Sequence, residues 1–134
     1  MLVDYTPKKL QIRMSYERPL ISIRSNGIIF FYNSLIKKLN IKPGDDQVLF
    51  SFDPDSGIWY LSKSKQGLKV KFHIDAPRNG AYITSISLRN KIIMNSLHLL
   101  NSVEPNDCLY MSVSDNPISY KSRSELLYEI KLLR

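Results

Sequence analysis

The chain has 134 residues, of which 43% are hydrophobic and 23% charged, as in an ordinary globular domain. Its 19 lysines and arginines against 12 aspartates and glutamates give a net charge of +7, which favours contact with nucleic acid or another anionic surface, although such charge also serves solubility alone. The single cysteine, Cys108, excludes an intrachain disulfide and a zinc site built from cysteines. With no apolar run of roughly 20 residues, we expect a cytoplasmic protein that makes no contact with membranes.

Residues 1–18 are predicted to form an N-terminal arm and a first strand, without the apolar stretch of a signal peptide. The strand is indicated by the alternation of Leu10, Ile12 and Met14 with polar residues. A second strand is expected from Leu20 to Arg24. The Ser25-Asn26-Gly27 turn that follows predicts a type I′ hairpin, because Asn and Gly tolerate positive φ.

The returning strand, Ile28 to Phe31, leads into a predicted helix from Ser34 to Asn40. Leu35, Ile36 and Leu39 lie on one face of this helix, and Asn33 or Ser34 is the expected N-cap. Pro43-Gly44 ends the segment, since proline cannot continue a helix. The alternation of Val48, Phe50 and Phe52 with less apolar neighbours then predicts a strand with one buried face.

The middle of the chain reads as further hairpins. Residues 54–57 form a turn, and a strand is predicted from Ile58 to Leu61, followed by a basic connection with Lys63 and Lys65. The next strand is predicted to point Leu68, Val70 and Phe72 inward and its lysines outward. A second Asn-Gly turn, at residues 79–80, precedes a strand over residues 81–84.

A second helix is predicted from Leu88 to Asn101, and it is broken at Pro105. After it, Leu109, Met111 and Val113 alternate with polar residues, which predicts a strand. The C-terminal tail favours a strand over residues 127–132, with a terminal helix as the alternative.

The two halves of the chain match each other in order. Leu39-Asn40 corresponds to Leu100-Asn101, and the strands that follow correspond at the same spacing of 61 residues. The two Asn-Gly turns lie 53 residues apart, so we expect the second copy to carry 8 more residues between hairpin and helix. The sequence therefore predicts a first repeat over residues 19–66 and a second over 67–134, intertwined in one domain. The alternative is a chance self-match between hairpins.

The run Leu39-Asn40-Ile41-Lys42-Pro43-Gly44-Asp45, after a hairpin and before an alternating strand, resembles the swapped-hairpin module of the AbrB, MazE and SpoVT transition-state regulators. The resemblance implies an α+β, mostly β fold: a pseudo-symmetric swapped-hairpin barrel, AbrB-like or double-psi-like, with two short helices. One chain would supply both copies, as tandem members such as MraZ do. The chain departs from the family in lacking a proline before the first helix, where residues 31–33 are Phe-Tyr-Asn.

The resemblance also implies a DNA-binding face on the hairpin turns and helix starts. Two arginines flank the two Asn-Gly turns, two lysines lie on the first helix, and two cations open the second; these candidates are Arg24, Lys37, Lys38, Arg78, Arg89 and Lys91. Lysine and arginine on one face release counterions from phosphates and so provide affinity for DNA. The alternative is that each of these residues belongs to a solvated face.

Motifs of catalysis or cofactor binding are missing from the sequence, so we expect neither an enzyme nor a bound cofactor or metal. His73 and His98 have no ligand partners at suitable spacing. Residues 53–57 resemble a calcium loop, but Ser64 stands where such a loop needs a glutamate. Cys108 is expected to be a small buried residue.

The expected function is therefore duplex DNA binding, as a transcriptional regulator or antitoxin-like repressor, with a homodimer left open. The alternatives are a protein-interaction or structural module, such as an accessory protein of a mobile element, and a single-stranded nucleic-acid binder. Trp59-Tyr60 and Phe30-Phe31-Tyr32 are the aromatic residues that could stack on single-stranded bases.

Overall fold

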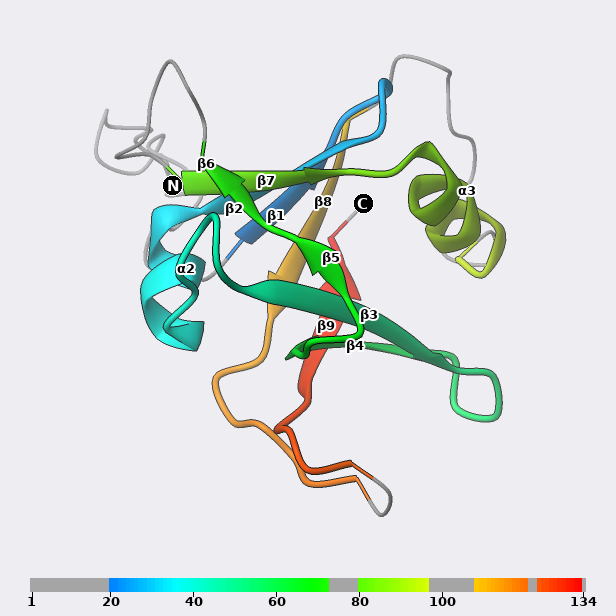
Figure 1. Cartoon of the computed structure of the whole chain (residues 1–134). Coiled ribbons are helices and arrows are strands. Elements are labelled where there is room, and N and C mark those ends of the chain that lie inside the picture. Colours follow the sequence, from blue (N-terminus) through cyan, green and yellow to red (C-terminus); the bar gives the residue numbers. More distant parts are fainter. Residues whose placement is uncertain (1–19, 73–79, 97–107, 121–122, 134) are drawn as a thin grey trace, which may run out of the picture.

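A computed structural model of the chain describes residues 20–72, 80–96, 108–120 and 123–133. Nine strands and two helices lie in these residues (Figure 1). In chain order they are β1 (Leu20–Ile23), β2 (Ile28–Tyr32), α2 (Asn33–Leu39), β3 (Gln47–Asp53), β4 (Ile58–Lys63), β5 (Leu68–Lys69), β6 (Lys71–Phe72), β7 (Gly80–Thr84), α3 (Ile86–Met94), β8 (Leu109–Val113) and β9 (Tyr128–Leu132). The strand predicted in residues 10–14, the turn residue Asn79, both histidines and the range 97–101 of the second predicted helix lie outside the described residues.

The strands form one antiparallel sheet that curls into a nearly closed barrel. Its order is β5-β3-β4-β9-β8-β1-β2-β7-β6. The two strands at its ends, β5 and β6, are consecutive in the chain and are separated only by Val70. The segment from Leu68 to Phe72 therefore pairs with β3 through its first half and with β7 through its second, and it closes the barrel as an eighth strand.

Val70 is the residue at which this closing segment passes from one neighbour to the other. Its side chain is fully buried. Its N–H donates to the carbonyl oxygen of Asp46 (3.1 Å), and its own carbonyl oxygen accepts from the N–H of Gly44 (2.7 Å). The Pro-Gly-Asp turn predicted from the sequence thus satisfies the backbone groups that Val70 could not pair within the sheet.

The strands of residues 19–66 and those of residues 67–134 interleave around the barrel. The hairpin β1–β2 lies between β8 and β7, and the hairpin β3–β4 lies between β5 and β9. Each pairing in one half has a counterpart in the other: β1·β2 corresponds to β6·β7, β3·β4 to β8·β9, and β1·β8 to β5·β3. The remaining pairs, β2·β7 and β4·β9, join each strand to its own counterpart, and together with β1·β8 and β5·β3 they connect the two halves. This is the two-fold correspondence expected of an internal repeat.

The core lies inside the barrel and uses the inward face of every long strand. The predicted alternation is confirmed in β8, where Leu109, Met111 and Val113 are all buried. In β3, Val48 is buried and the rings of Phe50 and Phe52 are half-buried against the core. Branched aliphatic residues, which on the strands fit a pleated surface, dominate the largest fully buried side chains: Ile21, Ile23, Ile29, Phe31, Leu35, Val48, Leu61, Ser62, Val70, Ile83, Ile92 and Met111.

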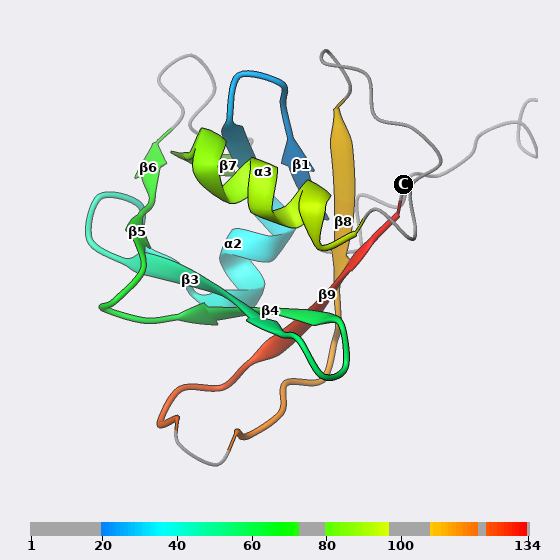
Figure 2. The same cartoon turned by 90° about the vertical axis from the view of Figure 1, so that its right-hand side faces the viewer.

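The two helices lie on opposite sides of the barrel (Figure 1), and along the view of Figure 2 α3 crosses in front of it with α2 behind. α2 buries Leu35 and Leu39 and ends at Asn40, which takes the left-handed conformation (φ 52°). The predicted cap was wrong: the N-cap is Tyr32, which makes no side-chain capping bond.

α3 begins at Ile86, two residues before the predicted start, because Ser85 is its N-cap and accepts a hydrogen bond from the N–H of Leu88 (3.1 Å). The helix thus follows β7 directly, as α2 follows β2. The expectation of 8 extra residues between hairpin and helix in the second copy is therefore wrong. In the described residues the strand–helix units match at the 53-residue spacing of the Asn-Gly turns, and the extra length comes after Met94.

The structure tests three further predictions from the sequence. The β1–β2 turn is not type I′, because only Gly27 has positive φ (86°) there and its N–H donates to the carbonyl oxygen of Arg24 (3.0 Å), as in a three-residue loop with a bulge. Leu68 was expected to face the core but is 42% exposed. The C-terminal tail is a strand, β9, which pairs with β4 and β8.

Candidate nucleic-acid interface

Arg24 is exposed at the end of β1, where its guanidinium carbon lies 6.0 Å from the centroid of the Phe30 ring. The hairpin that carries it touches the start of α3: the carbonyl oxygen of Gly27 accepts from the N–H of Ser85 (2.8 Å). A Cβ on Gly27 would collide with Ile86, so this close approach requires glycine. Arg24 therefore lies near the α3 side of the barrel.

Lys37 and Lys38 lie on α2, on the other side of the barrel (Figure 1). Lys37 is exposed. The ammonium of Lys38 forms an ion pair with Asp115 (2.7 Å), and its side chain is only 21% exposed. Lys38 therefore joins α2 to the connection after β8, and it is less available to an external phosphate than Lys37.

Arg89 does not belong to an exposed face, which corrects its choice as a DNA contact. It is 7% exposed on α3. At the 53-residue spacing, Arg89 corresponds to Ile36, which packs against the core from α2. The same face of the helix is thus turned inward in both copies. If the two copies had been aligned by the 53-residue spacing of their Asn-Gly turns, the burial of Arg89 could have been predicted from that of Ile36. Arg78 lies outside the described residues.

Lys91 is exposed on α3, beside a hollow of about 290 Å³ between α3, β3 and the β4–β5 turn. Gln66 lines this hollow and also a second one, of about 590 Å³, on the other side of the same turn. Lys63, Lys65 and Arg123 line the second hollow. We call the surface formed by Lys63, Lys65, Lys91 and Arg123 around Gln66 the basic band.

The β4–β5 turn holds the centre of the basic band in one conformation. The N–H of Gly67 donates to the carbonyl oxygen of Ser64 (3.1 Å), and the N–H of Gln66 donates to the Ser64 hydroxyl (3.2 Å). A Cβ on Gly67 would run into the carbonyl group of Val48, so the turn sits tightly on β3. Lys63 is anchored as well, because its ammonium donates to the carbonyl oxygen of Asn40 (3.1 Å) and lies 3.6 Å from the carboxylate of Asp46.

Arg123 joins the band from a distant part of the chain, the connection that precedes β9. Arg123 and its neighbours Ser124 and Glu125 line the same hollow as residues 63–66 of the β4–β5 turn. Its guanidinium lies 3.6 Å from the carboxylate of Glu125. The pKa of Glu125 is lowered by a hydrogen bond from its own backbone, by the Ser124 hydroxyl (3.1 Å) and by the charge of Arg123. Glu125 is thus ionised at neutral pH and partly offsets Arg123.

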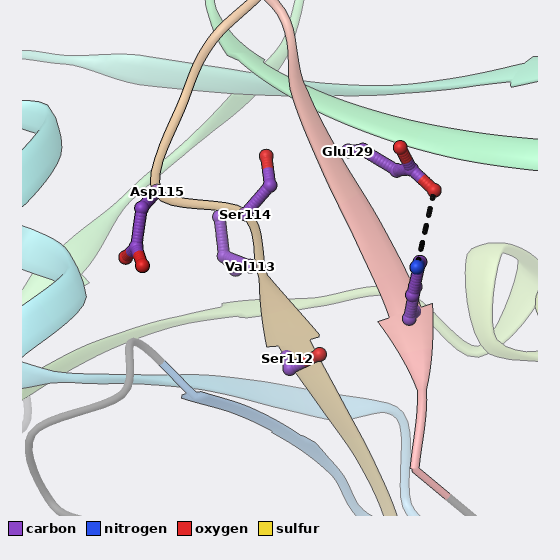
Figure 3. A pocket seen from close by; sticks show the side chains of 6 residues that line it. Ser112, Val113, Ser114, Asp115 and Glu129 are labelled. Carbon is purple, nitrogen blue, oxygen red and sulfur yellow. Dashed lines mark ion pairs between the residues drawn. The ribbon is translucent and has the colours of Figure 1, made fainter.

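A third hollow, of about 320 Å³, lacks such an excess of positive charge (Figure 3). It lies between β8 and β9 and is lined by the hydroxyls of Ser112 and Ser114, the carboxylates of Asp115 and Glu129, and Lys131. Lys131 is held 3.9 Å from Glu129. Asp115 is paired with Lys38 and Glu129 with Lys131, so the charges at this hollow balance and no excess of cations is left to attract phosphate.

The aromatic residues considered for base stacking are mostly buried. Phe30, Phe31, Trp59 and Tyr60 are between 0% and 9% exposed, and Tyr32 is half-buried. Rings with so little exposed surface cannot stack on an incoming base without rearrangement. The structure therefore does not favour these residues as a stacking platform.

Cys108 is exposed, contrary to its expected burial. A hydrogen bond between the side chains of Cys108 and Tyr110 is the main cause that raises the pKa of the Tyr110 phenol. Among the described residues, no three His, Cys, Asp or Glu side chains are grouped so that they could hold a metal ion, and no helix is long and apolar enough to cross a bilayer.

Comparison with family models, curated proteins and solved structures gave no match. The candidate interface is therefore identified from the residues and geometry of this chain only. The segment from Lys63 to Lys71 carries four lysines in nine residues, and that density is the signal by which the β4–β5 turn could have been chosen from the sequence. The contribution of Arg123 has no such signal, since 57 residues separate Gln66 from Arg123.

Proposed function

We propose that the protein binds nucleic acid, and duplex DNA in particular, through the basic band. The observation that carries this proposal is the convergence of four cations from three separate elements around Gln66. Cations held on one face neutralise neighbouring phosphates, and the release of counterions from those phosphates provides most of the affinity. The hydrogen-bonded β4–β5 turn holds the backbone that carries Lys63 and Lys65, which limits the backbone entropy lost there on binding.

In its specific form, the proposal is a transcriptional regulator or an antitoxin-like repressor that acts without chemistry of its own in the cytoplasm. A swapped-hairpin barrel of the AbrB, MazE and SpoVT kind is the proposed fold family. The alternation of hairpins from the two halves of the chain supports it, as does the Pro-Gly-Asp turn that backs the closing segment.

The test is a pair of double variants that remove the same charge from different faces. Lys65→Ala with Lys91→Ala removes two of the four charges of the basic band, whereas Lys37→Ala with Lys131→Ala removes two exposed lysines elsewhere. We expect the first pair to weaken binding of a fluorescent duplex by about tenfold or more at low salt, because it removes two cations that neutralise phosphates, and the second to change it by less than about threefold. Wild-type protein that fails to bind duplex at low salt would exclude the proposal.

A protein-interaction module is the second candidate, and exposed apolar side chains near α3 favour it. Ile86 is 57% exposed, Met94 64% and Leu68 42%. Such residues are ordinary singly but together mark surfaces for protein contact. Light scattering of the purified chain tests for a homodimer and so for a protein-interaction module. Binding of a single-stranded oligonucleotide in place of duplex would indicate the single-strand binder.

A further inference from the structure

The larger hollow of the basic band has the composition of an anion site. Its lining comes from two stretches of chain, residues 63–66 and 123–125. They contribute three cations, two hydroxyls and an amide against one carboxylate: Lys63, Ser64, Lys65, Gln66, Arg123, Ser124 and Glu125. Its volume of about 590 Å³ falls within the range of small-molecule sites, about 300–1,000 Å³.

We propose that this hollow is a phosphate-binding site, with Lys65 and Arg123 as the direct ligands. The phosphate belongs either to the backbone of a bound nucleic acid, in which case the inference rests on the proposed function, or to a free phosphate compound. Arginine suits this task because its planar fork of donors matches two phosphate oxygens, and lysine adds a point charge.

The neighbouring groups complete the site without changing position. The Ser64 hydroxyl accepts from the N–H of Gln66, which leaves its own hydrogen free to donate to a phosphate oxygen. Lys63 stays tied to Asn40 and Asp46 and contributes its charge from the rim. The turn therefore presents its donors in place before a ligand arrives, which lowers the entropy lost on binding.

Glu125 occupies the position of a competing anion. Its carboxylate lies 3.6 Å from the Arg123 guanidinium and carries one negative charge, whereas a phosphate group carries up to two. A phosphate ligand must displace this carboxylate from Arg123 or share the guanidinium with it. Removing the charge of Glu125 is therefore expected to strengthen phosphate binding. If only the overall charge of the protein mattered, this residue would have no special effect.

The experiment is a titration of the full chain, followed by the amide chemical shifts of residues 63–67 and 123–125. The probes are inorganic phosphate and pyrophosphate, and separately an unlabelled duplex. We expect saturable shifts confined to these residues, at least fivefold weaker binding in Lys65→Ala and in Arg123→Ala, and at least twofold tighter binding in Glu125→Gln. Lys131→Ala is the matched control, since Lys131 is exposed and lies by the separate hollow between β8 and β9.

The outcomes separate this site from the function of the protein. Shifts that spread over all lysines without saturation, or that Arg123→Ala leaves unchanged, overturn the phosphate site. If the wild-type chain binds duplex and the Arg123→Ala variant keeps wild-type affinity for both pyrophosphate and duplex, the phosphate site fails while nucleic-acid binding stands. If pyrophosphate binds as expected and duplex does not, the site holds a free phosphate compound and the proposed function fails. Lys65 and Arg123 are exposed, so far-UV circular dichroism should show an unchanged fold.

Discussion

The salt dependence of duplex binding gives the sharpest test of the basic band. Each phosphate that a lysine or arginine neutralises contributes about −0.9 to the slope of log affinity against log salt. If each of the four cations of the band contacts one phosphate, the slope is roughly −3.6. Between 50 and 200 mM salt, affinity should then fall about 150-fold.

Removing Lys65 and Lys91 together leaves two contacts. The slope should drop to roughly −1.8, and the loss of affinity over the same range of salt to about 12-fold. Both side chains are exposed, so the fold should not change. Fluorescence anisotropy of a labelled duplex of at least 20 base pairs, at four salt concentrations, measures both slopes.

The control is again the double variant of Lys37 and Lys131, which has the same net charge as the test variant. Its slope should stay within about 0.5 of the wild-type value, since neither lysine belongs to the band. Equal slopes for the two double variants would refute the reasoning. Binding would then depend on overall charge and not on the arrangement of the cations around Gln66.

Three further predictions concern the barrel and its surface. Gly80→Ala should lower the free energy of unfolding by about 3 kcal/mol, because its Cβ would run into the Phe31 carbonyl between β2 and β7 and the backbone there has positive φ. Gly57→Ala should cost only about 1–2 kcal/mol for its positive φ, since its Cβ would meet nothing within 4 Å. Urea unfolding measures both, and equal losses would contradict the close approach. Burial raises the pKa of Tyr60 above 10.0, so its stabilising contribution is present below pH 10 and is lost as the pH rises; Tyr60→Phe should show a shallower loss of stability above pH 10. Asp115→Asn should change stability by less than about 1 kcal/mol, since Asp115 is 84% exposed in its pair with Lys38; a larger loss in thermal unfolding would show that this pair fastens α2.

Strand alternation and turn chemistry were the sequence features that predicted this fold best. Leu109, Met111 and Val113 are buried as their alternation requires, because a period of two places alternate residues on one face of a strand. Helix starts were predicted less well. Ser85 caps α3 because it stands where β7 ends, and the apolar pattern of residues 88–101 had pointed further along the chain.

The sequence by itself determined the mostly β class of the fold, most of its strands and the excess of positive charge. These are local properties, set by periodicity, by Gly and Pro and by composition. Only the tertiary structure decided that Val70 closes the barrel, that Arg89 is turned inward, and that Arg123 meets Lys65 beside one hollow. Each of these depends on which distant segments lie side by side, and pairing between strands is a non-local contact that no window of sequence contains.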